Sequence, residues 1–297
     1  MLTAVRSFFA ERKVMEVDTP ILSHSAPVDL HIEIMTVDVC QGEKGYLHSS
    51  PEYAMKRLLA LGSGDIYQLS HVFRAEQSGR LHNPEFMMIE WYRIGMSLPH
   101  LIEETLDLIR LFVGDQPATF HTYAEIFQQC TGIDYRKASL PTLKNLIEPY
   151  HPPSDVSSWD LDGYLHFIMG FIIEPKLQGL HVICDYPPSQ AALATTRDTP
   201  EGPVAERFEV YFNGIELANG FHELTQPTEQ RRRFLAANIE RQKLGKSQLP
   251  LDENFLAALE KGLPDSCGVA VGFDRLLMLK LGKTTLKEVL PFAWEES

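Results

Sequence analysis

The sequence of 297 residues has few cysteines, no long apolar run and no excess of positive charge. The four cysteines, Cys40, Cys130, Cys184 and Cys267, form no Cys-x-x-Cys pair, which argues against structural zinc and favours buried free thiols in a reducing cytoplasm. No stretch approaches the roughly 20 apolar residues of a membrane-spanning helix. The net charge of −13 argues against a broad nucleic-acid-binding surface, which would need clustered lysine and arginine.

The overall composition is that of an ordinary globular protein. Hydrophobic residues make up 44% of the chain and charged residues 23%, which is enough apolar mass for a sizeable core. Residues 1–13 form an amphipathic stretch with charge throughout, so they do not resemble a signal peptide. A cytoplasmic protein is therefore expected, although a short N-terminal leader could be missing.

The apolar residues alternate between strand and helix patterns along the chain. The turn Asn213-Gly214 between two apolar runs predicts a tight β-hairpin. Strands are expected at residues 15–17, 32–39, 66–74, 85–93, 181–185, 207–212, 215–217 and 268–271, and helices at 2–13, 52–61, 99–113, 228–244, 254–261 and 273–281. This order predicts an α+β fold with a largely antiparallel sheet flanked by helices, forming one domain over residues 1–297 with a helical insertion at about 123–179.

Two arginine motifs carry most of the chemical information. Arg74 stands in Phe-Arg-Ala-Glu at the end of an apolar strand, and Arg275 in Gly-Phe-Asp-Arg where a buried strand enters a helix. Guanidinium groups bind phosphate oxygens bidentately, so two arginines aimed at one site suit a polyphosphate. The carboxylates beside them suit Mg²⁺ or a substrate ammonium. The pair of motifs predicts ATP together with an amino-acid-like substrate.

The order of these segments resembles the catalytic domain of the class II aminoacyl-tRNA synthetases. The first helix with residues 17–20 resembles motif 1, residues 73–92 resemble motif 2, and residues 272–275 resemble motif 3. Residues 50–52 (Ser-Pro-Glu) and 216–223 (Glu-Leu-Ala-Asn-Gly-Phe-His-Glu) resemble the lysyl-tRNA synthetases in particular. The resemblance covers essentially the whole chain.

The resemblance implies a nucleotide site. Arg74 would bridge the substrate carboxylate and the α-phosphate of ATP. Arg275 would hold the γ-phosphate and lie over one face of the adenine, with Phe86 stacked on the other. Glu216 would hold the Mg²⁺ that bridges the phosphates, so these three residues are the implied catalytic group. The other residues implied at ATP are Glu76, Arg80, His82, Asn83, Phe86, Leu217 and Gly272.

The resemblance also implies a pocket for a diamino acid. Glu52 would meet the backbone amine, and Glu223 with Tyr92 the side-chain ammonium; Glu223 is also expected at Mg²⁺. A neutral side chain of similar size would leave Glu223 unpaired, which selects against it. The same pocket would be lined by Ser50, Pro51, Asn219, Phe221 and Ala270.

Two features differ from an ordinary lysyl-tRNA synthetase. The chain starts at the motif 1 helix, without the anticodon-binding domain of those enzymes, which makes tRNA an unexpected acceptor. Ala270 stands where they have glycine, and one added methyl group in a close-packed pocket can change which substrate backbone fits. Both features, and residues 80–86, 206–211 and 214–224, resemble the elongation factor P–(R)-β-lysine ligases. That family implies a β-lysyl-adenylate, or a lysyl-adenylate, and its transfer to a lysine ε-amino group of elongation factor P.

Motif 1 further implies a homodimer, with Phe8 and Phe9 on the apolar face of the first helix. That face could equally be internal core. Arg74 and Glu76 could be a surface ion pair of little energetic weight, and Glu216 and Glu223 could face solvent on a hairpin. All of these residues match one family pattern in order, which favours the functional interpretation.

Two other classes of function stay open. One is a free-standing enzyme that acts on tRNA, which would need a basic patch; residues 231–233 (Arg-Arg-Arg) are the obvious run and are expected to be a solvated helix face. The other is a non-catalytic, amino-acid-sensing relative of the synthetases. Such proteins often lose a motif arginine or a metal carboxylate, whereas Arg74, Arg275 and Glu216 are all present.

Overall fold

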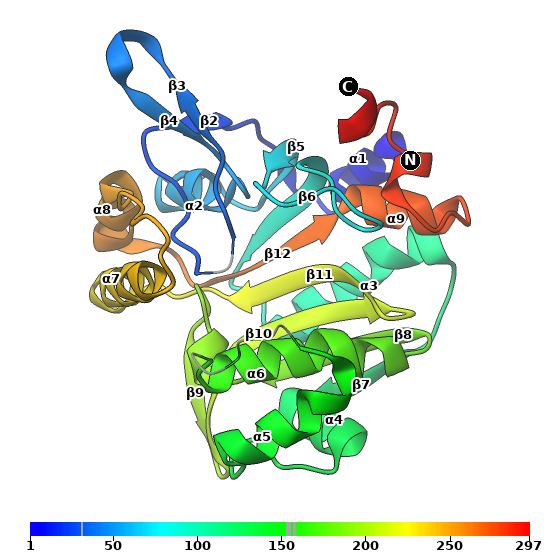
Figure 1. Ribbon diagram of the computed structural model, residues 1–297. Coiled ribbons are helices and arrows are strands. Elements are labelled where there is room, and N and C mark those ends of the chain that lie inside the picture. The colour runs from blue at the N-terminus through cyan, green and yellow to red at the C-terminus, as the bar shows by residue number, and fades with distance from the viewer. Residues whose placement is uncertain (31, 153–155, 157–158) are drawn as a thin grey trace. The chain divides into compact units, whose positions relative to one another are not determined.

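The computed structural model describes residues 1–30, 32–152, 156 and 159–297, which divide into two compact units. The first unit comprises Met1–Asp115 and His222–Ser297, and the second comprises Gln116–Phe221. Helices and strands occur in both (Figure 1), and the predicted α+β class is confirmed. The single domain over residues 1–297 stays a prediction.

The first unit is built on a four-stranded part of the main sheet. Its strands follow the order β1 (Met15–Glu16), β5 (Ile66–Phe73), β6 (Glu85–Ile94) and β12 (Ser266–Gly272). β1 runs parallel to β5, and the other neighbours are antiparallel. The register sets Gln68 opposite Glu90 and Glu90 opposite Ala270, so these side chains share one face of the sheet.

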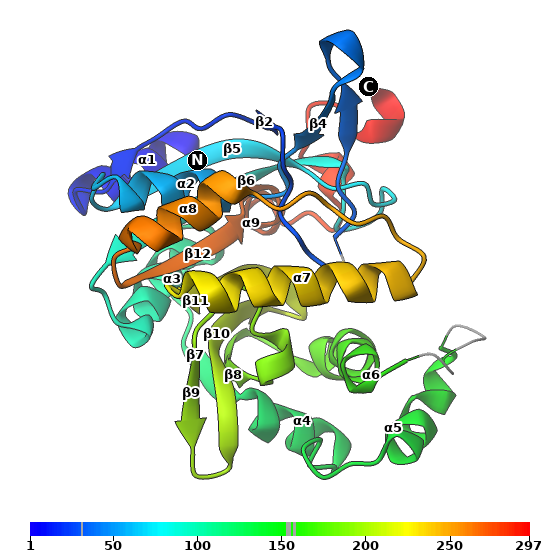
Figure 2. The same ribbon diagram turned by 90° about the vertical axis from the view of Figure 1, so that its left-hand side faces the viewer.

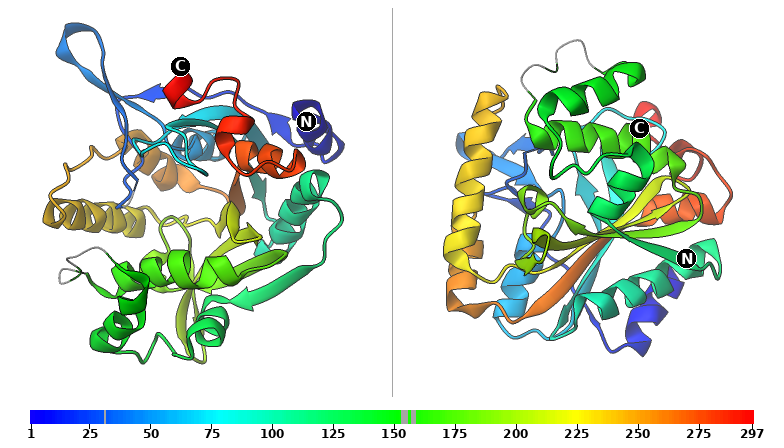
Figure 3. Two further views of the ribbon diagram at one scale, coloured as in Figure 1. Left: turned by 45° about the vertical axis from the view of Figure 1, so that its right-hand side comes forward. Right: turned by 90° about the horizontal axis from the view of Figure 1, so that it is seen from below.

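The opposite face of this sheet is apolar. It is associated with α1 (Leu2–Glu11), α3 (Leu98–Val113) and α9 (Phe273–Lys280), which Figure 3 shows beside one another. The Phe9 ring stacks on Tyr67 with centroids 4.1 Å apart and lies edge-on to Trp91.

Phe8 and Phe9 are 5% and 0% exposed, so they are internal core of the protomer. They therefore cannot form the dimer face that motif 1 led us to expect. The apolar character of this helix face reflects folding within one chain.

Three helices belong to the polar face of the sheet: α2 (Glu52–Ala60), α7 (Pro227–Lys243) and α8 (Glu253–Gly262). α8 packs against both α2 and α7 (Figure 2), and the ring of Tyr53 stacks on Phe255 at 4.5 Å. α2 ends before Gly62, whose φ of +85° is a conformation that glycine adopts without steric cost.

A small second sheet extends from this unit (Figure 1). It has the order β2 (Leu22–Ser23), β4 (Lys44–Leu47) and β3 (Thr36–Asp38), so the strand expected at 32–39 is shorter than predicted. The cysteines are all free as expected, but only Cys267 is buried: Cys130 and Cys184 are partly buried, and Cys40 beside this sheet is exposed, so the prediction of burial is wrong for it.

The second unit contains β7 (Ala118–Thr122), β8 (Leu180–Tyr186), β10 (Gly202–Phe212) and β11 (Ile215–His222) in the spatial order β11-β10-β8-β7. β7 is parallel to β8 and the other pairs are antiparallel. Asn213 and Gly214 adopt φ values of 50° and 75°, as the predicted hairpin requires. β9 (Thr196–Thr199) pairs with β10, so the segment from 195 to 203 belongs to a β-hairpin.

Short helices fill the remainder of the second unit. They are α4 (Tyr123–Thr131), α5 (Leu140–Ile147) and α6 (Leu161–Ile168), and they bury a core of their own. Residues 153–155 and 157–158 of the expected insertion lie outside the described residues. No helix in the described part of the chain has the length and apolar character needed to cross a bilayer.

Candidate active site

A group of buried carboxylates lies on the polar face of the sheet in the first unit. Glu90 extends from β6 and is 2% exposed; Glu223 follows β11 and is also 2% exposed. The backbone N–H of Glu223 donates to Ser266 O at 3.0 Å, which fixes Glu223 beside β12. Glu52 begins α2, which packs over the same face. Three acidic groups distant in sequence thus meet, with Glu90 and Glu223 buried and Glu52 partly buried, and Glu223 does not face solvent.

Two neutral hydroxyl groups hold the Glu90 carboxylate. The Ser50 hydroxyl donates to Glu90 at 2.7 Å and accepts from the Glu52 N–H at 3.0 Å. The Tyr92 hydroxyl donates to the other oxygen of Glu90 at 2.7 Å. Pro51 is the N-cap residue of α2, so the Ser-Pro-Glu sequence places both a hydroxyl and a carboxylate at one helix start.

The one cation of this group is Lys56, one helical turn after Glu52. Its Nζ lies 2.6 Å from Glu52 Oε1 and forms a second ion pair with Glu223, and the side chain is 1% exposed. Neither Lys56 nor Glu90 is among the site residues predicted from the sequence. The i,i+4 spacing of Glu52 and Lys56 was the signal for the first pair, because such residues are neighbours on a helix.

Burial shifts the ionisation of these groups. Loss of water, and then repulsion by Glu52, raises the pKa of Glu90 to about 8. Loss of water also raises the pKa of Glu223 to about 7, because the burial cost outweighs the attraction of Lys56. Burial alone would lower the pKa of Lys56, but the carboxylates of Glu223 and Glu52 raise it to about 12. The pocket therefore has more acidic groups than cations.

Several polar atoms on this face have no protein partner. Three side chains of the described residues on this face have buried polar atoms that form no hydrogen bond. The atoms are Oε1 of Glu223, both polar side-chain atoms of Gln68 and the hydroxyl of Ser70. Buried polar groups in native proteins are nearly always satisfied. Unpaired acceptors beside excess carboxylates suit a ligand that brings ammonium groups.

Gly268 forms the floor of this pocket. A Cβ at this position would lie 2.3 Å from the Tyr92 ring and 2.5 Å from Glu223 Oε1, so no side chain fits there without a shift of the pocket. Ala270, two residues along the same strand and face, pairs across with Glu90 and is partly exposed. The strand thus places its smallest residues beneath the carboxylates.

The predicted nucleotide residues of the first unit form a second group. The guanidinium carbon of Arg74 lies 5.1 Å from the Phe86 ring centroid, and Arg74 Nε is buried without a partner. Arg275 contacts His82, with 3.2 Å between Nη2 and Nε2, and donates through Nε to Leu81 O. Loss of water and repulsion by Arg275 lower the pKa of His82, whereas Glu76 acts in the opposite direction.

Motif 3 is held against motif 2 by Asp274. Its carboxylate accepts from the Met87 N–H at 2.8 Å, and this sets the start of α9, where Arg275 lies. Gly272 is the N-cap residue of α9, but an added Cβ would only touch the Arg275 side chain at 3.7 Å. The chain itself does not require glycine there, so its predicted role at ATP stays a prediction.

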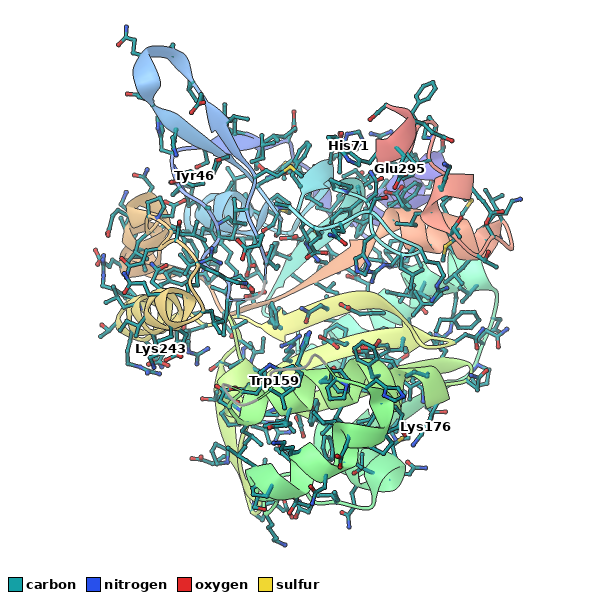
Figure 4. The ribbon with its side chains drawn as sticks, in the orientation of Figure 1. Tyr46, His71, Trp159, Lys176, Lys243 and Glu295 are labelled. Carbon is teal, nitrogen blue, oxygen red and sulfur yellow. The ribbon has the colours of Figure 1, made fainter. Side chains whose placement is uncertain are left out.

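Arg80 and Asn83 are both bonded to the C-terminal segment. Arg80 Nη1 lies 3.5 Å from Thr284 O, and Asn83 Oδ1 accepts from the Trp294 N–H at 3.1 Å. Glu295, labelled in Figure 4, belongs to the same segment. These bonds support the loop structurally, and the ATP contacts expected of Arg80 and Asn83 stay predictions.

The remaining predicted residues lie on β11 in the second unit: Glu216, Leu217, Asn219 and Phe221. Asn219 Oδ1 accepts from Arg207 Nε at 3.2 Å, and the same guanidinium lies 5.9 Å from the Phe221 ring centroid. Arg207 also ion-pairs with buried Glu209. Neither Arg207 nor Glu209 is among the predicted site residues, although both stand in the segment 206–211 that carries the resemblance.

An open hollow of about 760 Å³ elsewhere in the first unit is lined by residues such as Arg12, Arg93 and Asp107. It contains none of the predicted site residues. The candidate site is therefore assigned from buried charge and unpaired polar atoms, because these have a chemical meaning that the size of a hollow lacks.

Comparison with known proteins agrees with this geometry. The family of class II tRNA synthetases (D, K and N) matches residues 1–296. Relatives named elongation factor P–(R)-β-lysine ligase are 42% identical in Actinobacillus succinogenes, 44% in Vibrio cholerae and 40% in Pasteurella multocida. This chain belongs to that ligase family. In the same order, the alignments cover 99%, 98% and 100% of this chain and 92%, 92% and 94% of the relatives.

Family membership confirms the predicted resemblance and the predicted class II fold. The domain of this ligase is that of ATP-using enzymes, which agrees with the arginines and carboxylates described above. The relatives are named for joining (R)-β-lysine to elongation factor P.

The basic run at 231–233 is paired within the chain: Arg231 with Glu253, and Arg232 and Arg233 with Glu229.

Proposed function

We propose that this chain uses ATP to activate (R)-β-lysine or lysine as an aminoacyl-adenylate and transfers the acyl group to a lysine of elongation factor P. The observation that carries this proposal is the pocket of Glu52, Glu90 and Glu223. Its buried carboxylates outnumber its cations, so an amino acid with two ammonium groups compensates them where a neutral side chain would not.

In the first step, a substrate carboxylate oxygen attacks the α-phosphorus of ATP and pyrophosphate leaves. Both reactants are anions, so the protein must bring negative charges together and neutralise them. Arg74 follows directly on β5, whose polar face includes Gln68 beside Glu90, and its buried Nε has no protein partner. We assign Arg74 to the substrate carboxylate and α-phosphate, and Arg275 with His82 to the outer phosphates.

In the second step, the lysine amine of the partner attacks the acyl carbon, AMP leaves and the amine gives up a proton. No enzyme nucleophile is required. The protein must keep the diamino acid in place during this exchange, and Glu52, Glu223 and Tyr92 are the residues that we assign to its ammonium groups.

We also propose that Glu216 contributes to a Mg²⁺ site. Among the described residues no group of three or more His, Cys, Asp or Glu side chains could hold a metal ion alone. Mg²⁺ at nucleotide sites commonly takes one or two carboxylates together with phosphates and water, so Glu216 fits that chemistry. The ion would neutralise phosphate charge during activation. Glu223 fits less well, because Lys56 is already its ion partner.

A protein acceptor agrees with the surface charge better than tRNA does. The net charge is −13, and the arginines at 231–233 are ion-paired to Glu229 and Glu253. Free lysine and arginine residues are what phosphate neutralisation needs. We further propose a homodimer in the cytoplasm, which sedimentation and cell fractionation would test.

The decisive experiment has two parts. Pyrophosphate exchange into ATP is measured with (R)-β-lysine, lysine and leucine, and purified elongation factor P is then analysed by mass spectrometry after incubation with ATP, Mg²⁺ and either lysine isomer. We expect exchange with the two diamino acids only, and one added lysyl mass on the partner.

Different outcomes point to the other functions. Efficient charging of total tRNA with an unmodified partner would contradict the protein-ligase function. Absence of exchange with every amino acid would favour a sensing protein. An Arg74→Ala variant serves as the inactive control in both parts.

A further inference from the structure

We propose that Lys56 is the resident counter-ion of the pocket and thereby determines that the substrate carries two ammonium groups. Glu52 and Glu223 both pair with this one lysine, and Glu90 pairs with no cation among the described residues. Two carboxyl groups therefore stay to be matched, and they ionise when ammonium groups of the substrate enter. This inference rests on the proposed function and extends it to a residue that neither the motifs nor the family name assigns.

The position of Lys56 is fixed by its surroundings. The side chain is 1% exposed, and its ammonium lies 6.0 Å from the ring centroids of both Tyr92 and Phe255. It therefore cannot turn toward solvent without leaving both Glu52 and Glu223. A buried ammonium with two carboxylate partners is a permanent part of the charge of the pocket.

The charge count depends on which other groups reach the carboxylates. Ser50 and Tyr92 donate to Glu90 but are neutral, so they do not compensate its charge. His222 lies beside Glu223 in sequence and has the smallest effect among the groups that act on the Glu223 pKa, and its ring bonds to Asp265 at 2.7 Å. No other lysine or arginine of the described ranges forms an ion pair with Glu52, Glu90 or Glu223.

The two carboxylate partners of Lys56 also explain why this lysine is not itself acylated by the adenylate. An unprotonated amine would attack the activated carboxyl group, as the partner lysine does. The Lys56 ammonium is bound by two carboxylates, Glu52 at 2.6 Å and Glu223, and an ammonium held in this way has no lone pair for such an attack. Lys56 thus neutralises charge without acting as an acceptor.

A purely structural role makes a different prediction. If Lys56 only filled space between α2 and β12, any group of similar shape would replace it, whatever its charge. If Lys56 is a counter-ion, only a cation replaces it.

The first test is chemical rescue. Lys56→Ala removes the atoms of n-propylammonium, which is supplied in solution, with 1-propanol as its neutral counterpart. We expect kcat/KM for diamino-acid-dependent pyrophosphate exchange to fall about 100-fold, in line with the loss of one partner from a buried ion pair. Added propylammonium should raise kcat/KM of Lys56→Ala about tenfold, and 1-propanol should leave it unchanged.

Lys243→Ala is the matched control. Lys243, labelled in Figure 4, also lies 2.6 Å from a glutamate of its own helix, Glu240, but its side chain is 65% exposed. Exposed pairs of this kind contribute little, so this variant should keep its activity and show no response to propylammonium. Equal rescue of Lys56→Ala by the alcohol and the ammonium would overturn the proposal.

The second test needs no turnover. Calorimetric affinities are measured for lysine and for norleucine, which carries a methyl group in place of the side-chain ammonium. We expect wild-type protein to bind lysine about 100-fold more tightly than norleucine. Lys56→Ala should keep or increase this preference, because it leaves one more carboxylate charge to be matched, and propylammonium should return the preference to the wild-type value. Equal binding of both amino acids by the wild type would refute the charge match, whereas tight lysine binding without any exchange would refute only the proposed ligase reaction.

A third measurement covers the case in which Lys56→Ala does not fold. Thermal unfolding of Lys56→Met, Glu223→Gln and the double variant forms a mutant cycle. We expect the double variant to unfold at a higher temperature than Lys56→Met, because it no longer buries an uncompensated Glu223. Additive losses in this cycle would show that Lys56 does not neutralise Glu223 and would overturn the inference.

Discussion

The carboxylate pocket and the arginine group of the first unit differ in charge and in burial. In the pocket, Glu90 and Glu223 are 2% exposed and carry raised pKa values of about 8 and 7. In the arginine group, His82 is exposed and Arg275 bonds to a backbone carbonyl and to that histidine. The pocket is thus prearranged for one kind of cation, whereas the arginines contact partners that phosphate oxygens can replace.

The difference shows where selectivity and reactivity reside. Burying a carboxylate costs free energy that only a matched cation returns, so the pocket discriminates strongly between amino acids. Guanidinium groups bind phosphate readily but discriminate little, because every nucleoside triphosphate carries the same charges. Substitutions in the arginine group should therefore lower mainly kcat, whereas substitutions in the pocket should raise mainly KM for the amino acid.

The largest expected effect comes from Arg74, which we assign to the reacting carboxylate and α-phosphate. Arg74→Ala should lower kcat for pyrophosphate exchange about 1000-fold, because it removes charge neutralisation where two anions react. The midpoint of thermal unfolding should change little, since Arg74 Nε is buried without a protein partner. Arg74→Lys should recover only part of the rate, because an ammonium cannot bind two oxygens in a fork. A loss confined to KM would contradict this role.

A change in the pocket floor should break selectivity together with stability. Gly268→Ala places a methyl group against Tyr92 and Glu223, and overpacking of this kind typically costs about 1–3 kcal/mol. We expect KM for the diamino acid to rise more than tenfold while KM for ATP changes little, as measured by steady-state exchange. Gly170→Ala is the control, because an added Cβ there meets nothing within 4 Å. Unchanged lysine affinity in Gly268→Ala would show that the pocket lies elsewhere.

The raised pKa values predict that the pocket and the arginine group respond differently to pH. In the empty pocket Glu90 and Glu223 hold protons up to a pH of about 8 and 7, and an entering ammonium lowers both pKa values. Binding therefore releases protons, and affinity should rise with pH through this window by at most about tenfold per unit for each proton released.

Calorimetry in buffers of different ionisation enthalpy measures this proton release directly. Glu90→Gln should reduce the slope of affinity against pH, because one of the two titrating groups is lost. ATP affinity should not follow the same slope. Lysine binding that weakens as pH rises from about 6 to 8 would have the wrong sign for this mechanism.

The smallest effect is expected at Ala270. This methyl group pairs across the strands with Glu90, so its removal should enlarge the pocket without changing its charge. We expect Ala270→Gly to shift the ratio of kcat/KM for α-lysine over β-lysine upward by about three- to tenfold. Competition assays with both isomers measure the ratio, and an unchanged ratio would leave this methyl group without a role in selection.

The strands that carry the site were predictable from local pattern. β5 and β6 were expected at 66–74 and 85–93 and are found at Ile66–Phe73 and Glu85–Ile94. A tight turn sequence likewise predicted the hairpin at Asn213 and Gly214. Such signals are local, because apolar periodicity and glycine φ values depend on neighbouring residues.

Short and edge strands were not predictable in the same way. β7 and β9 carry mixed polar sequences, Ala-Thr-Phe-His-Thr and Thr-Arg-Asp-Thr, with weak alternation. They are strands because β8 and β10 supply their hydrogen bonds. The pairing partner, rather than the intrinsic pattern, decides such segments.

The amino-acid sequence by itself determined the family, the order of its motifs and the types of residue at the two sites. Ordered arginines, carboxylates and glycines suffice for that, because each motif is a contiguous segment with its own chemistry. Only the tertiary structure decided that Lys56 faces both Glu52 and Glu223, that Glu90 joins them, and that Phe8 and Phe9 are core. The physical reason is that exclusion of water arises from segments far apart in the chain, and it sets the charge balance of a buried pocket.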